Sequence, residues 1–313
     1  MSKPILVGYD PDTLDIAPVR FGAAAARFTG ARLIVAAVHA GGSGGGLEAS
    51  EQVDERLTDD AGEALADVER ELAGEGIAVE CQALQNTSAP RALHEAAESQ
   101  DAGLLVVGST RRGTIGRVLP GSTAERLMHG APCPIAVVPH RWEAGGGLRT
   151  IGVAYVDTEE GREALRGAHA LARRAGATLR VLSAVRDRLA MYGETEARTA
   201  GVRGKDFDEV EGEYRVRAED AARAAVGRLD GGVPVEVDAF VEDPAEVLIR
   251  VSEHLDLLVC GSRAYGPLRA VLLGGVSRRV TADARCPVIV LPRGTEASLE
   301  ALMAPTPDPS TPT

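Results

Sequence analysis

Aromatic residues make up only 3% of this 313-residue chain, and their scarcity excludes one class of function. Proteins that bind single-stranded nucleic acid without sequence preference stack the bases on several aromatic side chains. The chain also lacks an excess of basic residues, since its formal net charge is −12 at pH 7. Nucleic acids and anionic lipid surfaces attract positively charged proteins. We therefore expect no nucleic-acid partner and no membrane partner.

Long hydrophobic runs and paired cysteines are absent too. No run reaches the roughly 18 apolar residues of a membrane-spanning helix, and the opening MSKPILVGYD lacks the apolar core of a secretory signal. The cysteines show no Cys-x-x-Cys spacing and no nearby histidine cluster; they are Cys81, Cys133, Cys260 and Cys286. We expect reduced, mostly buried thiols rather than zinc ligands, in a cytoplasmic protein.

The sequence does contain a long internal repeat. The segment LLVVGSTRRGTIGRVLPGSTAERLMHGAPCPIAVVP at 104–139 aligns without a gap with LLVCGSRAYGPLRAVLLGGVSRRVTADARCPVIVLP at 257–292. Earlier in each copy, ILVGYD at Ile5 aligns with IGVAYV at Ile151. A repeat of this length is a duplicated domain rather than a solenoid unit.

The composition places the boundaries of the two copies. Three consecutive glycines within His140–Arg149 are typical of a linker, and the end of the chain is rich in proline and threonine. We predict domains at 1–141 and 149–294 and a disordered tail at 295–313. The second copy carries extra residues, for which we predict a mobile loop over Arg186–Tyr214 leading into a helix over Asp206–Leu229.

Short apolar runs alternate with helical patterns in each copy. In the first copy they predict strands at Pro4–Gly8, Arg32–His39, Ala78–Leu84, Leu104–Gly108 and Ile135–Val138. The predicted helices are Pro18–Thr29, Glu48–Ala73, Pro90–Ser99 and Ser122–His129. Strands that lack in-out alternation and are separated by helices indicate a parallel sheet covered on both faces. The predicted fold class is therefore α/β, with two tandem doubly wound, five-stranded parallel-sheet domains.

The glycine-rich loop Gly108–Thr123 follows the carboxyl end of a predicted strand, where open α/β sheets bind ligands. Ser122 and Glu125 have the spacing of a capping box, so Ser122 is explained as a helix N-cap. The glycines and the helix start are equally suited to a phosphate, and both interpretations stay open. The chain has neither G-x-x-x-x-G-K-[ST] nor G-x-G-x-x-G after its first strand.

Three features together resemble tandem members of the universal stress protein family, a form common in actinobacteria. They are the opening ILVGYD, the closing strands APCPIAVVP and ARCPVIVLP, and the glycine loop between them. The resemblance covers both copies. It implies a five-stranded parallel α/β fold, a stress-response role in the cytoplasm and, in some members, binding of ATP, AMP or a related nucleotide. It also implies pairing through the last strands, so we predict that the two copies pack across a pseudo-twofold axis.

ATP-binding members of the family carry Gly-x-x-Gly, nine residues, then Gly-Ser or Gly-Thr, and an aspartate at the end of the first strand. In the first copy the resemblance implies a nucleotide site of Asp10, Val38, Gly108, Arg111, Gly121, Ser122 and Thr123. Arg111 replaces the second glycine and either fills the site or pairs with phosphate, and we expect pairing. Asp10 either contacts the nucleoside or is a turn residue beside Pro11.

The second copy departs further from the family pattern. Val156 stands where the aspartate belongs, and Ala264 replaces the second glycine. The candidate residues that remain are Gly261, Gly274 and Gly275, and they lack the hydroxyl that follows the last glycine. We expect the first copy to bind nucleotide more tightly than the second.

No catalytic constellation is visible in the sequence. The histidines do not pair with a serine or cysteine nucleophile in the repeat pattern, and nothing indicates a Mg²⁺ carboxylate pair. We expect no catalytic or metal-binding residues and no enzyme activity, or at most a very weak ATPase. Two hypotheses remain: a cytoplasmic stress-response regulator that binds ATP or AMP, or a nucleotide-free module that acts as a homodimer or with another protein partner. We favour the first.

Overall fold

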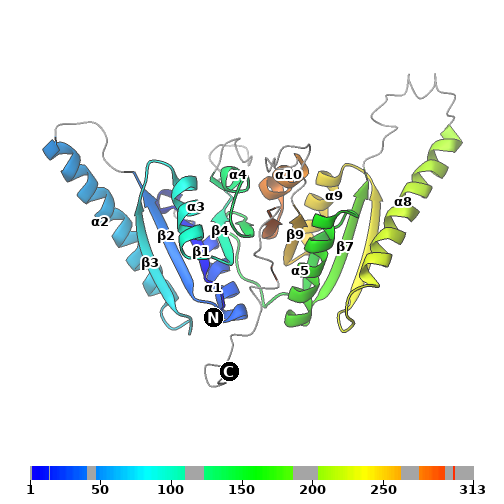
Figure 1. The fold of residues 1–313 in the computed structure, drawn as a ribbon, viewed down its shortest axis with the longest axis horizontal. Helices are drawn as coiled ribbons and strands as arrows, with labels where there is room; N and C mark the ends of the chain where they lie inside the picture. Colours follow the sequence, from blue (N-terminus) through cyan, green and yellow to red (C-terminus); the bar gives the residue numbers. More distant parts are fainter. Residues whose placement is uncertain are drawn as a thin grey trace.

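The computed structural model describes residues 2–13, 15–40, 47–109, 123–185, 204–261, 275–292 and 299. Their strands form one sheet in the order β3-β2-β1-β4-β5-β10-β9-β6-β7-β8 (Figure 1). In the first copy the strands are β1 (Ile5–Tyr9), β2 (Leu33–His39), β3 (Val79–Gln85), β4 (Leu104–Gly108) and β5 (Ile135–Val138). In the second they are β6 (Thr150–Ala154), β7 (Thr178–Val185), β8 (Val235–Val241), β9 (Leu257–Gly261) and β10 (Val288–Leu291). The α/β class is confirmed.

Helices cover both faces of the sheet (Figure 1). The first copy contains α1 (Ala17–Thr29), α2 (Leu47–Leu72), α3 (Ala89–Ser99) and α4 (Thr123–Leu127), with a short 3₁₀ turn, η1 (Pro11–Thr13). The second contains α5 (Glu159–Ala175), α8 (Gly204–Val226), α9 (Pro244–Val251) and α10 (Gly275–Asp283), with a second 3₁₀ turn, η2 (Ser252–His254). The strands within each copy pair in parallel, as the uninterrupted apolar runs predict.

The last strands of the two copies join the sheets. β5 and β10 run antiparallel, with Ala136 opposite Ile289 at the centre of the pairing. This confirms the predicted packing through the last strands. The copies also meet on one face of the sheet, where Arg174 of α5 donates a hydrogen bond to the carbonyl of Phe28 at 3.0 Å and lies over its ring.

Two hydrophobic layers run through both copies, one on each side of the sheet. One layer buries residues of α1, α2, α5 and α8, and the other buries residues of α3, α4, α9 and α10. Because each layer contains residues from both copies, folding of one half supports the other.

Most predicted bounds agree with the structure to within one residue, and three larger differences stand out. α4 ends at Leu127 rather than His129, with a turn after it. α8 begins at Gly204, so the prediction of a mobile loop as far as Tyr214 is wrong from residue 204 onward. The residues from 204 continue the helical pattern. The first part of the predicted loop, residues 186–203, lies outside the described residues. Leu299 falls in the tail predicted to be disordered, yet it is buried against Gly167 of α5, so the predicted disorder does not apply to it.

Gly22 sets the distance between α1 and the sheet. A Cβ at this position would lie 2.4 Å from Val7 Cγ2 and 3.1 Å from Leu33 Cδ1. We predict that Gly22→Ala lowers the free energy of unfolding by about 1–3 kcal/mol, because overpacking outweighs the better helix propensity of alanine. Denaturant or thermal unfolding of the full chain measures this change.

Gly62→Ala is the matched control, since Gly62 is exposed in α2 and nothing lies within 4 Å of its Cβ position. Here the same substitution should stabilise the chain by about 0.5–1 kcal/mol. Equal effects at both positions would contradict the close packing of α1 on β1.

Candidate functional site

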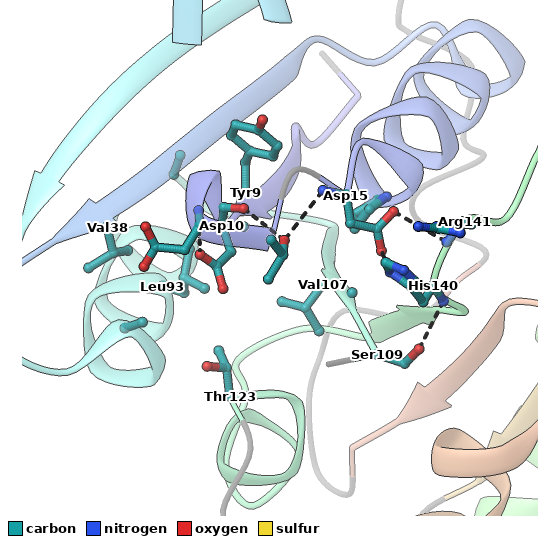
Figure 2. Close-up of a pocket in the computed structure, with 17 residues that line it drawn as sticks. Tyr9, Asp10, Asp15, Val38, Leu93, Val107, Ser109, Thr123, His140 and Arg141 are labelled. Carbon is teal, nitrogen blue, oxygen red and sulfur yellow. Dashed lines mark hydrogen bonds and ion pairs between the residues drawn. The ribbon is translucent and has the colours of Figure 1, made fainter. Parts of the chain in front are cut away.

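A pocket of about 500 Å³ opens at the carboxyl ends of β1, β2, β4 and β5 (Figure 2). Four residues of the predicted nucleotide site line it: Asp10 after β1, Val38 in β2, Gly108 at the end of β4 and Thr123 at the start of α4. The sheet brings these residues together from four separate segments. This is the edge where open α/β sheets bind their ligands.

Of the other predicted site residues, the structure describes Gly261 and Gly275, and neither lines this pocket. Arg111, Gly121, Ser122 and Gly274 fall outside the described residues, as does the capping box that Ser122 would form. Gly261 ends β9, and Gly275 is exposed at the start of α10.

Asp10 forms the turn that follows β1. Its Oδ1 atom accepts a hydrogen bond from the Asp12 N–H at 3.2 Å, and its carbonyl accepts one from the Thr13 N–H at 3.2 Å. These contacts stabilise η1, so Asp10 has the role of a turn residue beside Pro11, one of the two roles expected for it. Asp10 is thus a turn residue and a pocket residue at once.

Asp15 was not predicted from the sequence, yet it organises one wall of the pocket. Its Oδ1 atom accepts hydrogen bonds from the N–H groups of Ala17, at 3.2 Å, and Arg141, at 3.3 Å. Its Oδ2 atom lies 2.8 Å from His140 Nδ1, and the side chain is only 9% exposed. The backbone N–H of His140 also donates to Ser109 Oγ at 3.1 Å. Asp15 therefore ties the start of α1 to the segment after β5.

Only part of this network has a local signal in the sequence. An aspartate shortly before Pro18 indicates a cap for the following helix. The contact with His140 joins residues 125 positions apart, so no spacing rule points to it.

The equivalent position in the second copy has backbone rather than a side chain as its nearest neighbour. The glycine that corresponds to Gly108 is Gly261, and a Cβ on it would lie 3.0 Å from the Glu160 carbonyl oxygen. The backbone of the first turn of α5 therefore lies directly against the end of β9. In the first copy, the nearest atom to a Cβ on Gly108 belongs to the Pro18 side chain, at 3.1 Å.

This difference follows from where the helix begins. In the gapless alignment of Ile5 with Ile151, Thr13 corresponds to Glu159, so α5 begins about one turn earlier than α1. Thr158 caps α5 by accepting the Gly161 N–H at 3.1 Å. Gly161 occupies the position of Asp15, and any Cβ there would lie 2.0 Å from the Val156 carbonyl oxygen. The second copy cannot hold a carboxylate at this point without moving α5.

Asp157 does not take over the role of the missing aspartate. Its Oδ1 atom accepts hydrogen bonds from Arg162 Nη2 at 2.7 Å and from the Tyr155 hydroxyl at 3.0 Å. These hydrogen bonds, that from Arg162 foremost, lower the pKa of Asp157. The carboxylate is already engaged within the second copy.

The cysteine thiols are poor nucleophiles in this fold. Burial raises the pKa of Cys133, Cys260 and Cys286 to about 12, and burial together with Glu69 raises that of Cys81 to about 12. Very little thiolate is present at neutral pH at such values.

Within the described ranges, no group of three His, Cys, Asp or Glu side chains is arranged to hold a metal ion. No helix in the same ranges is both long enough and apolar enough to cross a bilayer.

Comparison with known proteins identifies the family. The model described as the universal stress protein family matches residues 1–139 and 147–292. The chain belongs to the universal stress protein family. The resemblance read from the sequence is confirmed, with the family domain occurring twice.

Other universal stress proteins resemble this chain in sequence and in fold. One from Mycobacterium tuberculosis is 29% identical over 227 residues, which cover 70% of this chain and 74% of the relative. One from Mycolicibacterium smegmatis is 35% identical over 137 residues, which cover 44% of this chain and 98% of the relative. A crystal structure from Archaeoglobus fulgidus matches 94% of this chain and 100% of its own with a TM-score of 0.66 at 19% identity. A crystal structure from Pseudomonas aeruginosa matches 96% of this chain and 95% of its own, with a TM-score of 0.63 at 20% identity. At such identities the crystal structures show the fold alone.

We predict that Asp15→Ala lowers the free energy of unfolding by about 2 kcal/mol. The change leaves the Ala17 N–H at the start of α1 and the Arg141 N–H without their acceptor. Denaturant unfolding measures the loss. Asp12→Ala is the control, because Asp12 is exposed in the neighbouring turn and should cost less than about 0.5 kcal/mol. Equal losses for the two variants would show that Asp15 does not anchor the wall of the pocket.

Proposed function

We propose that this universal stress protein is a cytoplasmic stress-response regulator that binds an adenine nucleotide, ATP or AMP. The nucleotide binds in the first of two domains, at 1–141, more tightly than in the second, at 149–294. The pocket at the carboxyl ends of β1, β2, β4 and β5 is the observation that carries the proposal. It gathers Asp10, Val38, Gly108 and Thr123, which the family resemblance marks for nucleotide binding.

Each of these residues suits one part of a nucleotide. Val38 offers an apolar surface for the base, and the Asp10 carboxylate accepts hydrogen bonds from ribose hydroxyls or the adenine amino group. Gly108 lets a phosphate approach the backbone, and Thr123 offers a hydroxyl donor. Arg111, Gly121 and Ser122 complete the proposed site from the loop that precedes Thr123.

The second domain is the weaker candidate because its own backbone covers the corresponding place. The Glu160 carbonyl lies against Gly261, and Val156 replaces the aspartate at the end of the first strand. The first turn of α5 thus places backbone, which cannot change rotamer as a side chain can, against the strand end that a phosphate would approach. Gly274 and Gly275 alone would then have to hold the ligand.

Regulation rather than catalysis is the proposed role, with at most a very weak ATPase activity. The alternative is a nucleotide-free module that associates with itself or with another protein. Its self-association through the last strands is already satisfied within one chain, because β5 pairs with β10. This pairing favours the nucleotide-binding proposal.

Calorimetric titration of the full chain with ATP tests the proposal. We expect one ATP per chain, and we expect Gly121→Val to abolish binding because its side chain crowds the phosphate. The matched control is Gly274→Val, the same change at the aligned position of the second domain, which should leave the affinity within about twofold. Absence of binding to the wild-type protein, or equal affinity for wild type and Gly121→Val, would favour the association module.

Arg111 stands where the family pattern has its second glycine, and the variant Arg111→Gly tests whether the arginine pairs with phosphate or fills the site. If Arg111 pairs with phosphate, the variant should lose about tenfold or more in affinity for ATP while its affinity for adenosine stays unchanged. The measurement is the ratio of the two dissociation constants in wild type and variant. A variant that binds ATP more tightly would show that Arg111 blocks the site instead.

A further inference from the structure

The pocket follows the edge of the sheet from β2 to β5. The carboxyl ends lie in the order β2, β1, β4, β5, and they carry in turn Val38, Asp10, Gly108, and then His140 with Arg141 (Figure 2). At about 4.8 Å between neighbouring strands, the pocket spans about 14 Å from β2 to β5. This length matches a nucleoside polyphosphate in an extended conformation better than a nucleoside alone.

The charges of the lining are separated along this edge. Asp10 and Asp12 lie at the β1 end and repel phosphate. His140 and Arg141 follow β5 and are the basic residues among the lining residues that the structure describes. An anion in this pocket is therefore least opposed at the β5 end. Asp15 also lines this end and keeps its negative charge while its oxygens accept hydrogen bonds from Ala17, His140 and Arg141. The positive charge of Arg141 lies at the same end, whereas the described lining has no basic residue at the β1 end.

His140 is held in one orientation by Asp15. A carboxylate only accepts hydrogen bonds, so the Nδ1 atom carries the proton in the 2.8 Å contact with Asp15 Oδ2. The Nε2 atom has no partner among the described residues, and the ring is 27% exposed. The imidazole thus has a fixed direction and one nitrogen available for a ligand.

Arg141 has a fixed backbone and a guanidinium that makes no ion pair within the described part of the chain. Its N–H donates to Asp15 Oδ1 at 3.3 Å, and its φ of 56° lies in the left-handed region, which residues other than glycine rarely adopt. The residue is exposed, and its guanidinium makes no ion pair with any residue in the described ranges. A cation held at the rim of a pocket without a protein partner is suited to an anionic ligand.

We propose that His140 and Arg141 form a second phosphate subsite, which binds the terminal phosphates of a nucleoside polyphosphate whose base lies near Val38. This inference rests on the proposed function, and it makes the pocket selective for ATP over AMP. The subsite is distinct from the glycine loop after β4, since its residues follow β5. The second domain cannot copy it, because Gly161 stands where Asp15 would hold the imidazole.

Titration of the full chain with ATP, ADP, AMP and adenosine tests the subsite. Arg141→Gln should weaken ATP binding about tenfold or more, ADP binding less, and AMP and adenosine binding less than twofold. His140→Gln should show the same order, and Arg141→Lys should restore part of the ATP affinity because it keeps the charge. Arg149→Gln is the matched control, since Arg149 is exposed near β6 and does not line the pocket. Its affinities should equal those of the wild type.

The outcomes separate this inference from the proposed function. If the wild type binds ATP and both pocket variants weaken all four ligands equally, or none of them, the nucleotide site stands and the second subsite is refuted. If the wild type binds none of the four ligands, both proposals fail. Arg141 is exposed, so its variants should unfold at the wild-type temperature, which circular dichroism checks.

Discussion

The Asp15 carboxylate accepts hydrogen bonds from the Ala17 N–H, the Arg141 N–H and His140 Nδ1, and these contacts decide where the helix after the first strand begins. α1 starts at Ala17, which leaves the end of β4 open as a pocket wall. α5 starts one turn earlier because Thr158 caps it, and its backbone then covers Gly261. A one-turn shift in a helix start thus places backbone against the strand end in the second copy, where the first copy has the side chain of Pro18.

Duplication gives the two copies unequal roles in this account. The second copy keeps the strand order and the helices, so it buries the β5 edge through β10 and shares both hydrophobic layers. An exposed last strand would present unpaired backbone groups to other chains. We infer that the second copy stabilises the first while the first retains the ligand pocket. The second copy has Val156 at the position of Asp10 and Gly161 at the position of Asp15, which fits this division of roles.

The strands and their parallel arrangement could be predicted because the uninterrupted apolar runs and the internal repeat are local signals. The pairing of the last strands followed from the family resemblance rather than from the residues themselves. The Asp15–His140 contact could not be predicted, since it joins distant residues and depends on the finished sheet. The contact between the Glu160 backbone and the end of β9 could not be predicted, because it depends on where the finished helix lies. The Thr158 cap that starts this helix does have a local signal in the sequence.

The central claim is that the first copy, and not the second, holds an adenine nucleotide. Native mass spectrometry of the freshly purified full chain measures this directly, because it weighs the protein with its bound ligand. A second spectrum after denaturation identifies what is released. We expect one adenine nucleotide per chain. A chain that carries no nucleotide after incubation with excess ATP, or one that carries two with equal affinity, would contradict it.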